Sequence, residues 1–321
     1  MKMILLQPAR RLLFAGCCLF AFCLSGTPAL AQYATEIVVA QDGSGDFTRI
    51  QEAIDEAKCF PDKRITIFIK SGIYREKIKV HAWNTLLTLK GENAATTIIT
   101  GGDFFDKIGR GRNSTFHTYT LLVQGDDFQA ENLTIENTAG PVGQAVALAV
   151  EADRCVFRHC RVLGCQDTLY TAGSNGRQHF VQCYIEGTTD FIFGPATALF
   201  DSCTIHSKSN SYITAASTPQ GKRFGFVFLH CRLTAAPGID SVYLGRPWRD
   251  FARVVFLNCE MGAHILPEGW QNWSDTQRDK TAFYAEFGNM GPGAAMVRRV
   301  SWSRVLSKKE ARKYTLENIL E

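Results

Sequence analysis

The chain has 321 residues, of which 45% are hydrophobic, and this is enough for one sizeable buried core or at most two domains. Its formal net charge at pH 7 is +4, and Lys2, Arg10 and Arg11 supply three of these positive charges in a segment without acidic residues. The rest of the chain is therefore close to neutral, which excludes a nucleic-acid binder that depends on many phosphate contacts.

The N-terminal segment has the three parts of a signal peptide. An apolar run at residues 12–24 follows the basic residues, and it is shorter than the roughly 20 residues that span a bilayer. A small-x-small motif ends at Ala31. We therefore expect residues 1–31 to be removed and residues 32–321 to be a secreted, extracellular or periplasmic protein with no membrane span. An uncleaved anchor, or a lipid anchor through Cys17, is the alternative.

The first predicted element after this segment is a helix at residues 50–57. Apolar residues recur there at the spacing of one helix face, so we expect the helix to seal the first structural unit. The preceding stretch from Asp42 to Asp46 is rich in Gly and Asp. A calcium loop of the EF-hand type would need an acidic residue at its twelfth position, where Ala53 stands, so we interpret the stretch as a turn.

The middle of the chain repeats one short pattern, in which apolar residues flank a central Asn or Cys. These central residues are spaced 28, 23, 20, 28 and 28 apart, and they are Asn132, Cys160, Cys183, Cys203, Cys231 and Cys259. Short segments rich in Val, Ile and Phe recur at this period, with Gly and Asp between them. Such a period predicts an all-β, single-domain parallel β-helix in which each coil stacks on the one before.

The cysteines have two interpretations. Three of the 11 lie in the N-terminal segment, and the even number that remains would suit the disulfide framework of an exported protein. Stacked coils, however, place equivalent residues about 4.8 Å apart with nearly parallel side chains, which is poor disulfide geometry. We therefore expect most of the repeated cysteines to be buried thiols in an inward-facing ladder.

The C-terminal segment carries two helix signals. Ser307 and Glu310 have the spacing of a capping box, which predicts a short helix. Thr315 is a candidate start for another helix. We expect these helices to cap the last coil, as the helix at residues 50–57 caps the first.

Polar residues recur at nearly the same period as the strands. Gln166 follows Gln144 by 22 residues, and Asp190 follows Asp167 by 23. These side chains should share one face of three successive coils, with the two carboxyl groups about 5 Å apart. Arg246 comes 56 residues after Asp190, about two coils on, and a guanidinium beside one Asp would keep it ionised.

This set of groups favours covalent acyl transfer. Two carboxyl groups at such a distance do not ionise independently, so one can be ionised while the other is protonated. Amide donors suit a developing oxyanion, and an ionised Asp can act as the nucleophile. A retaining glycosidase also uses carboxyl groups about 5–5.5 Å apart, but its cationic transition state gains nothing from an oxyanion hole. Taken singly, each residue is more typical of a turn or a backbone cap, and only their agreement with the repeat favours a site.

Five motifs taken together resemble the pectin methylesterases (pectinesterases), a family of carbohydrate esterases. The motifs occur in the same order along the chain as in members of the family, and the resemblance runs from about Val38 to the C-terminus. The motifs are Gly72-Ile-Tyr-Arg-Glu76, Gln144-Ala-Val-Ala-Leu148, Gln166-Asp-Thr-Leu-Tyr170, Asp190-Phe-Ile-Phe-Gly194 and Leu244-Gly-Arg-Pro-Trp248.

The resemblance implies a right-handed parallel β-helix and assigns catalytic roles. Asp190 would be the nucleophile that attacks the C6 ester carbonyl of methyl-esterified polygalacturonate. Asp167 would protonate the leaving methanol and then activate water. Gln144 and Gln166 would stabilise the oxyanion, and Arg246 would hold Asp190.

The resemblance also implies the partners of the protein. Trp248, Tyr170 and Phe193 would line a groove for pectin (homogalacturonan), and no metal or organic cofactor is implied. We expect a monomer. Ala149 and Pro195 depart from the family pattern, and the stretch at residues 213–219 is typical of bacterial members, so we expect a bacterial-type pectinesterase.

Three alternatives remain open. A different β-helical pectin enzyme, a lyase or a polygalacturonase, would need acidic or basic clusters that the sequence does not have. A non-catalytic carbohydrate-binding β-helix should have lost at least one of Asp167, Asp190 and Arg246, and all three are present. An esterase of the same fold with another ester as its substrate would differ in the loops of the groove.

Overall fold

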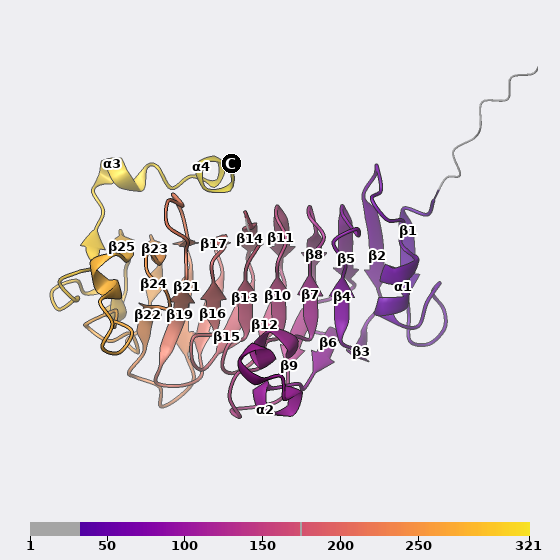
Figure 1. Ribbon diagram of the computed structural model, residues 1–321, viewed down its shortest axis with the longest axis horizontal. Coiled ribbons are helices and arrows are strands. Elements are labelled where there is room, and N and C mark those ends of the chain that lie inside the picture. Colours follow the sequence, from indigo (N-terminus) through magenta and orange to yellow (C-terminus); the bar gives the residue numbers. More distant parts are fainter. Residues whose placement is uncertain (1–32, 174) are drawn as a thin grey trace, which may run out of the picture. The chain divides into compact units, whose positions relative to one another are not determined.

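The computed structural model describes residues 33–321 except residue 174, and residues 34–321 form one compact unit. In this part of the chain, short parallel strands form three sheets that run along the unit (Figure 1). The chain passes through the three sheets in turn and then repeats, so the fold is a parallel β-helix, as the repeat predicts. The predicted signal peptide lies outside the described residues.

The three sheets have different lengths in the described part of the chain. Sheet A has eleven strands: β1 (Glu36–Val39), β2 (Ile65–Ile69), β5 (Leu87–Gly91), β8 (Gln129–Glu131), β11 (Cys155–Arg158), β14 (Arg177–Val181), β17 (Thr197–Asp201), β20 (Phe226–Leu229), β23 (Arg253–Leu257), β25 (Phe283–Phe287) and β26 (Arg304–Val305). Sheet B has eight: β3 (Gly72–Arg75), β6 (Thr97–Gly101), β9 (Thr134–Asn137), β12 (Arg161–Leu163), β15 (Tyr184–Gly187), β18 (Thr204–Ser207), β21 (Arg232–Ala235) and β24 (Glu260–Met261). Sheet C has seven: β4 (Ile78–Val80), β7 (Leu121–Val123), β10 (Leu148–Val150), β13 (Leu169–Thr171), β16 (Ile192–Gly194), β19 (Tyr212–Ala216) and β22 (Tyr243–Pro247).

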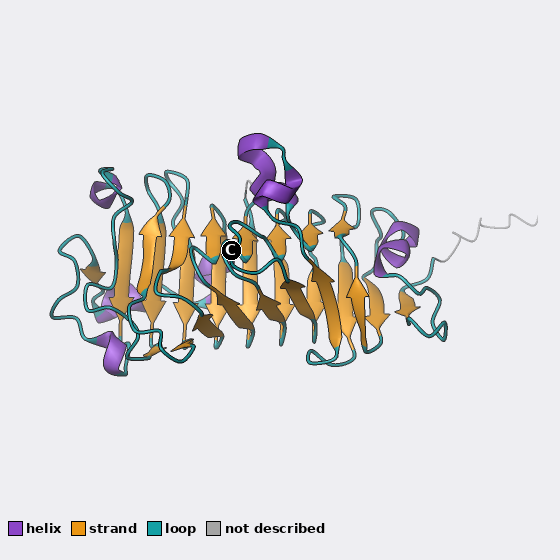
Figure 2. Cartoon of the chain, turned by 90° about the horizontal axis from the view of Figure 1, so that it is seen from below, coloured by secondary structure: helices purple, strands orange, loops and turns teal. Residues whose placement is uncertain are grey.

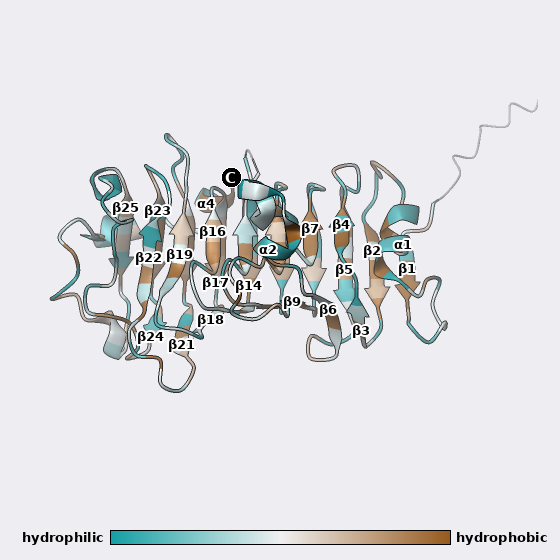
Figure 3. Ribbon diagram, turned by 60° about the horizontal axis from the view of Figure 1, so that its bottom comes forward, coloured by the Kyte–Doolittle hydropathy of each residue, from teal (hydrophilic) through white to brown (hydrophobic). Residues whose placement is uncertain are grey.

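A stack of phenylalanine rings runs through the core inside sheet A. Five rings at equivalent positions of successive coils lie nearly parallel, with centroid separations of 4.8, 5.0, 4.5 and 4.2 Å, and they are Phe157, Phe180, Phe200, Phe228 and Phe256. All five are fully buried. Hydrophobic segments recur from strand to strand along the β-helix (Figure 3). Burial of this ladder, together with the hydrogen bonds between coils, fixes the register of the coils.

The repeated cysteines form the expected ladder of buried thiols. Cys160, Cys183, Cys203, Cys231 and Cys259 are buried and free. From Cys183 onward, each sulfur atom lies near a backbone carbonyl oxygen of the preceding coil, as between Cys203 Sγ and Phe180 O at 3.3 Å. The prediction of thiols in place of a disulfide network is therefore confirmed for these residues. Outside the ladder, Cys59 is exposed.

Asn132 does not belong to this ladder, so the sequence-based alignment of that repeat is wrong by one residue. Thr134 pairs with Arg161, which makes Leu133 the equivalent of Cys160. Asn132 instead matches His159, and both have left-handed backbones, with φ of 53° and 51°. Asn adopts this conformation more readily than most residues, so it occupies the turn beside the ladder and is only half-buried.

The predicted N-terminal helix is present as α1 (Ile50–Glu56), and its apolar face is buried against the first coils. Its first N–H groups are satisfied by a distant carboxylate, because Ile50 N and Gln51 N donate to Glu76 at 3.0 and 3.2 Å. Glu76 thus ties the helix to the turn after β3. The expectation that this helix covers the first coils is confirmed.

The C-terminal helices form where the sequence predicts them, but they do not cap the last coil. Ser307 begins α3 (Lys308–Ala311) with a capping box, and Thr315 begins α4 (Leu316–Leu320). The segment runs back along the outer face of sheet A, and α4 packs on β14 and β17 (Figure 1). Ile319 is buried there among apolar residues of sheet A, so burial of that face decides the position.

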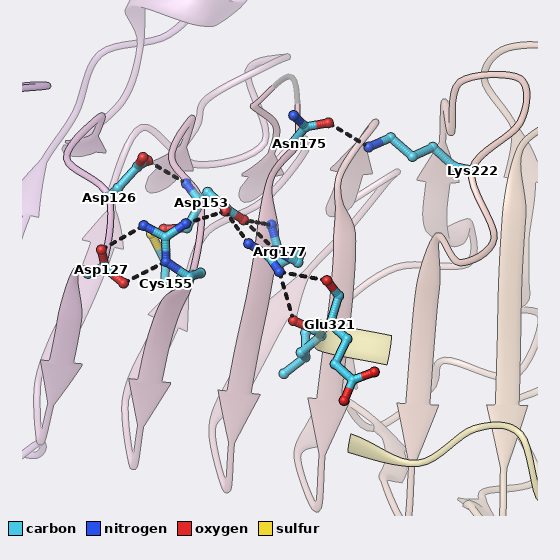
Figure 4. Close-up of polar contacts among 10 residues, drawn as sticks. Asp126, Asp127, Asp153, Cys155, Asn175, Arg177, Lys222 and Glu321 are labelled. Carbon is cyan, nitrogen blue, oxygen red and sulfur yellow. Dashed lines mark hydrogen bonds and ion pairs between the residues drawn. The ribbon is translucent and has the colours of Figure 1, made fainter. Parts of the chain in front are cut away.

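A polar network also holds this segment to sheet A (Figure 4). Arg177 donates to the carbonyl oxygens of Leu320 and Glu321 at 3.1 and 2.8 Å. The same guanidinium is paired with Asp153 at 2.6 Å, and Arg154 joins Asp153 to Asp127. The C-terminal residues are therefore bound to the middle coils of the stack.

The other helical segments lie at the margins of the strands (Figure 2). They are α2 (Phe105–Ile108), η1 (Gly111–His117), η2 (Arg278–Lys280) and η3 (Pro292–Ala294). α2 and η1 together make up the segment between β6 and β7. Among the described residues, none of the helices has the length and apolar character that crossing a membrane requires.

Shortening one ring of the phenylalanine stack should destabilise the fold strongly. We expect Phe200→Ala to lower the free energy of unfolding by about 3–5 kcal/mol, because it removes ring contacts on both sides and leaves a cavity. Denaturant unfolding followed by circular dichroism measures the change. Ile73→Ala, at a side chain that is 51% exposed, serves as the control and should change stability by less than about 0.5 kcal/mol. Equal effects of the two substitutions would contradict this account of the core.

Candidate active site

Two aspartates occupy equivalent positions of consecutive coils. Leu169 pairs with Ile192, and this register places Asp167 beside Asp190, two residues before each strand of the pair. Both aspartates have left-handed backbones, with φ of 61° and 50°, a conformation that Asp tolerates better than most residues. Each backbone N–H donates to a carbonyl of the next coil, at 3.1 and 2.8 Å. The hydrogen bonds between coils therefore hold the two carboxyl groups side by side.

Arg246 reaches Asp190 from two coils further on. Its Nε and Nη2 donate to the two carboxylate oxygens at 3.0 and 2.7 Å, which is a bidentate pair. The guanidinium also contacts the rings of Tyr212 and Trp273, each with its centroid 4.0 Å from Cζ. Two aromatic faces and one carboxylate thus fix the plane of the guanidinium.

A hollow of about 240 Å³ opens over these groups. Seven of the residues singled out from the sequence line it: Gln144, Gln166, Asp167, Asp190, Phe193, Arg246 and Trp248. Gln144 and Gln166 are joined by an isolated parallel bridge between their backbones. Within residues 33–321 other than 174, neither side-chain amide has a hydrogen-bond partner, so both are free to donate to a ligand. The same residues include no group of three or more His, Cys, Asp and Glu arranged to bind a metal.

The surroundings of the two carboxyl groups act differently on their pKa values. Burial raises the pKa of Asp167 well above its usual value, and the neighbouring charge of Asp190 raises it further. Burial also raises the pKa of Asp190, but the hydrogen bonds and charge of Arg246 act in the opposite direction. No group in the described chain donates a hydrogen bond to the Asp167 carboxyl. Asp190 therefore loses its proton first, and Asp167 keeps its proton to a higher pH.

The three predicted groove aromatics take different positions. Trp248 is half-buried and lies edge-on to Phe193, with ring centroids 5.8 Å apart. Phe193 is only 3% exposed and forms part of the floor. Tyr170 does not line the hollow: its ring lies 5.0 Å from Phe116 and 4.8 Å from Phe193, and burial raises its pKa to about 12. Tyr170 is only half-buried, so its predicted place in the sugar groove stays a prediction.

Other residues of the hollow were not predicted from the sequence: Arg112, Thr115, Phe116, Ala215 and Trp273. Three of them come from η1, which belongs to the insertion between β6 and β7, and Trp273 comes from the loop between β24 and η2. These segments do not follow the coil period, so the repeat gives no information about them. A Trp in a polar loop about one coil after the Arg246 motif was the available signal.

Comparison with known proteins identifies the family. The family model for pectinesterase matches residues 36–321. Over 281 residues the chain is 42% identical to pectinesterase 31 of Arabidopsis thaliana, with 85% of this chain and 88% of that protein covered. It is 39% identical to putative pectinesterase 11 of the same plant, with coverages of 89% and 79%. The chain therefore belongs to the pectinesterase family and is a carboxylic ester hydrolase.

Solved structures agree with this assignment. Pectin methylesterase from carrot matches with a TM-score of 0.83 and 35% identity, covering 88% of this chain and 92% of that one. Pectin methylesterase from Erwinia chrysanthemi matches with a TM-score of 0.76 and 28% identity, covering 90% and 98%. These proteins are right-handed parallel β-helices, so the predicted fold class is confirmed.

Two qualifications follow from the same comparisons. The chain spans about half the length of relatives described as pectinesterase/pectinesterase inhibitor, for example 52% of number 6 of Arabidopsis thaliana. The expectation of a bacterial-type member is not supported, because the curated relatives at 38–42% identity are plant proteins. The carrot structure also has a higher TM-score than the bacterial one.

Removing the charge of Arg246 should raise the pKa of Asp190. In Arg246→Gln the carboxylate keeps its burial but loses its bidentate partner, so its protonated form is favoured. A ¹³C NMR titration of the aspartate carboxyl carbons measures this pKa, and Asp190→Asn assigns the signal. Arg249→Gln removes a nearby exposed arginine that contacts Trp248 and should leave the pKa unchanged. An unchanged pKa in Arg246→Gln would show that Arg246 does not control the ionisation of Asp190.

Proposed function

We propose that this protein hydrolyses the C6 methyl esters of pectin, releasing methanol and leaving pectate. One observation carries the proposal: Asp190, paired with Arg246, lies beside Asp167, whose pKa burial raises, in a hollow with two free amides. Family membership supports an ester substrate. A structure of a pectin methylesterase in complex with a hexasaccharide, which matches this chain with a TM-score of 0.76 and 28% identity, supports a saccharide ligand.

In the first step the Asp190 carboxylate attacks the C6 ester carbonyl carbon. The carbonyl oxygen becomes an oxyanion, which accepts hydrogen bonds from the side-chain amides of Gln144 and Gln166. Asp167 gives its proton to the methoxy oxygen as the C–O bond breaks, and methanol leaves. The product is an anhydride between the Asp190 carboxyl and the C6 acyl group, and Asp167 is left ionised.

In the second step water hydrolyses the anhydride. The Asp167 carboxylate takes a proton from the water, whose oxygen attacks the C6 carbonyl carbon. The bond to Asp190 breaks, so the Asp190 carboxylate and the protonated Asp167 are both restored. The new galacturonic acid loses its proton to solvent, and its carboxylate then faces an ionised Asp190. Repulsion between these like charges favours release of the product.

The aromatic residues define where the sugar lies. Trp248 and Trp273 are half-buried at the hollow, so each can present a ring face or edge to a pyranose ring. Phe193 forms an apolar floor on which the methyl group of the ester can rest. Tyr170 packs beside Phe193, with ring centroids 4.8 Å apart, and is half-buried, so its exposed part can contact a sugar unit.

Methanol release from highly methylated pectin tests the proposal. The wild type should release methanol, while Asp190→Asn should release none, because the amide cannot act as the nucleophile. Asp167→Asn should be severely impaired, because it can neither protonate methanol nor take a proton from water. Unchanged turnover in either folded variant would overturn the mechanism. No methanol from a folded wild type would overturn the proposed substrate.

Loss of one oxyanion donor should reduce turnover without abolishing it. We expect Gln166→Ala to lower kcat by about 10²–10³-fold. Gln124→Ala is the matched control, because Gln124 is paired with Glu151 and does not line the hollow. An unchanged kcat in Gln166→Ala would remove Gln166 from this role.

The N-terminal segment belongs to the same proposal. Residues 1–31 direct export and are removed near Ala31. The enzyme therefore acts outside the cytoplasm, where pectin is found. We expect it to act as a monomer. N-terminal sequencing of the exported protein should begin at or near Gln32. An exported protein that still begins at Met1 would contradict cleavage.

A further inference from the structure

Two loops at the start of the β-helix expose aromatic side chains that have no part in the reaction. Trp83 lies between β4 and β5 and is 44% exposed, and Phe60 lies between α1 and β2 and is 71% exposed. No other Phe or Trp among the described residues is exposed to this degree. The two loops are joined, because Phe60 N donates a hydrogen bond to Trp83 O at 2.8 Å. We call these two residues the aromatic patch, and exposed apolar side chains that are grouped in this way are typical of a binding surface.

The loop of Trp83 is held in place by its neighbours. Its ring lies parallel to the ring of His81, with centroids 4.5 Å apart and an angle of 7° between the planes. His81 Nε2 lies 3.6 Å from a carboxylate oxygen of Asp55 in α1, and Asn84 donates to the carbonyl oxygen of Ile54 in the same helix. The indole therefore has a fixed position, with one face covered by the imidazole and a large surface left in solvent.

The backbone of Phe60 is strained without a return in burial. Its φ is 47°, in the left-handed region, which is unfavourable for a bulky residue other than Gly, Asn or Asp. An apolar ring at such a position adds little to the stability of the fold while it points into water. Strain of this kind is typical of residues that serve binding rather than folding.

The aromatic patch borders the sheet that carries the catalytic hollow. The pairings along sheet C place His81 directly after β4 where Trp248 stands directly after β22, at the opposite end of the sheet. From β16, which follows Asp190, there are four strand steps to β4, and this is about 19 Å at about 4.8 Å a step (Figure 1). A long ligand that leaves the hollow along sheet C toward the N-terminal coils therefore reaches the loop of Trp83.

The chemistry of the aromatic patch indicates the part of the polymer that it suits. Indole and phenyl rings bind the C–H face of a pyranose ring through dispersion and the burial of apolar surface. This contact needs no charge on the sugar. A methyl-esterified unit is uncharged at C6 and adds a methyl group to the apolar area, so it fits better than a unit with a free carboxylate.

We propose that Phe60 and Trp83 bind methyl-esterified sugar units of the same pectin chain whose ester reacts at Asp190, four coils away. This proposal rests on the proposed function and extends it to the length of the substrate. A chain that spans the distance between the hollow and the first coil gains a second contact. A chain too short to span it binds at the hollow alone, so the enzyme binds long polymers more tightly than short oligomers.

Kinetics on two substrates of different length test this proposal. One is highly methyl-esterified polygalacturonate, and the other is a methyl-esterified tetramer, which is too short to reach the aromatic patch from the hollow. Trp83→Ala should raise KM on the polymer about threefold to tenfold with little change in kcat, while the kinetics on the tetramer stay the same. Trp83→Phe should restore part of the loss. Phe60→Asn, which suits the left-handed backbone, should also raise KM on the polymer alone.

Binding without turnover provides a second measurement. In native gels that contain the same polymer, Asp190→Asn should be retarded, and adding Trp83→Ala to it should reduce the retardation. Met290→Ala removes an exposed apolar side chain beside β24, at the other end of the β-helix, and should change neither measurement.

The outcomes separate this proposal from its alternatives. Equal changes of KM on polymer and tetramer would indicate a structural effect, and no change on either would remove the contact, so both would overturn the proposal. Concentration-dependent dimers of the wild type that Trp83→Ala abolishes would assign the aromatic patch to a second copy of the chain instead. Absence of methanol from both substrates, with retardation that still depends on Trp83, would overturn the proposed function and leave the binding site standing.

Discussion

The hydrogen bonds between successive parallel coils decide which side chains of this protein meet. Because the coils pair residue by residue, a position on one coil has a fixed neighbour on the next. This register stacks the core phenylalanines, lines up the cysteine thiols, and brings together two aspartates that are 23 residues apart in sequence. It also sets Arg246 two coils beyond Asp190, within reach of its carboxylate. The site is thus a local variation of the same repeat that builds the core.

Placing two carboxyl groups side by side in a partly buried hollow is costly if both are ionised. The protein lowers this cost in two ways. Arg246 compensates the charge of Asp190 and is itself held between Tyr212 and Trp273. Asp167, which has no such partner in the described chain, keeps its proton. The difference in ionisation between Asp190 and Asp167 lowers the cost of burying the pair. The same difference provides one carboxylate as nucleophile and one protonated carboxyl as acid for the proposed reaction.

Structural features that follow the coil period can be predicted from the sequence. Most features on segments outside that period cannot. The β-helix, the buried thiols and the adjacency of Asp167 and Asp190 could be inferred, because each depends on spacing alone. Asn132 was placed one residue out of register, because Asn suits both a core ladder and a left-handed turn. The C-terminal helices were predicted as helices but assigned to the wrong place, since local caps do not show which face a helix covers. Arg112, Phe116 and Trp273 lie on segments outside the repeat. Only the folded chain brings these residues to the hollow.

The central claim is that at neutral pH Asp167 is protonated while Asp190 is ionised. Infrared difference spectroscopy of the folded protein tests it most directly, because protonated and ionised carboxyl groups absorb at different frequencies. The spectrum of the wild type minus that of Asp167→Asn should contain the band of a protonated carboxyl. The corresponding difference for Asp190→Asn should contain the bands of a carboxylate. A carboxylate signal lost in Asp167→Asn would contradict the account, because it would leave the pair without an acid for the leaving group.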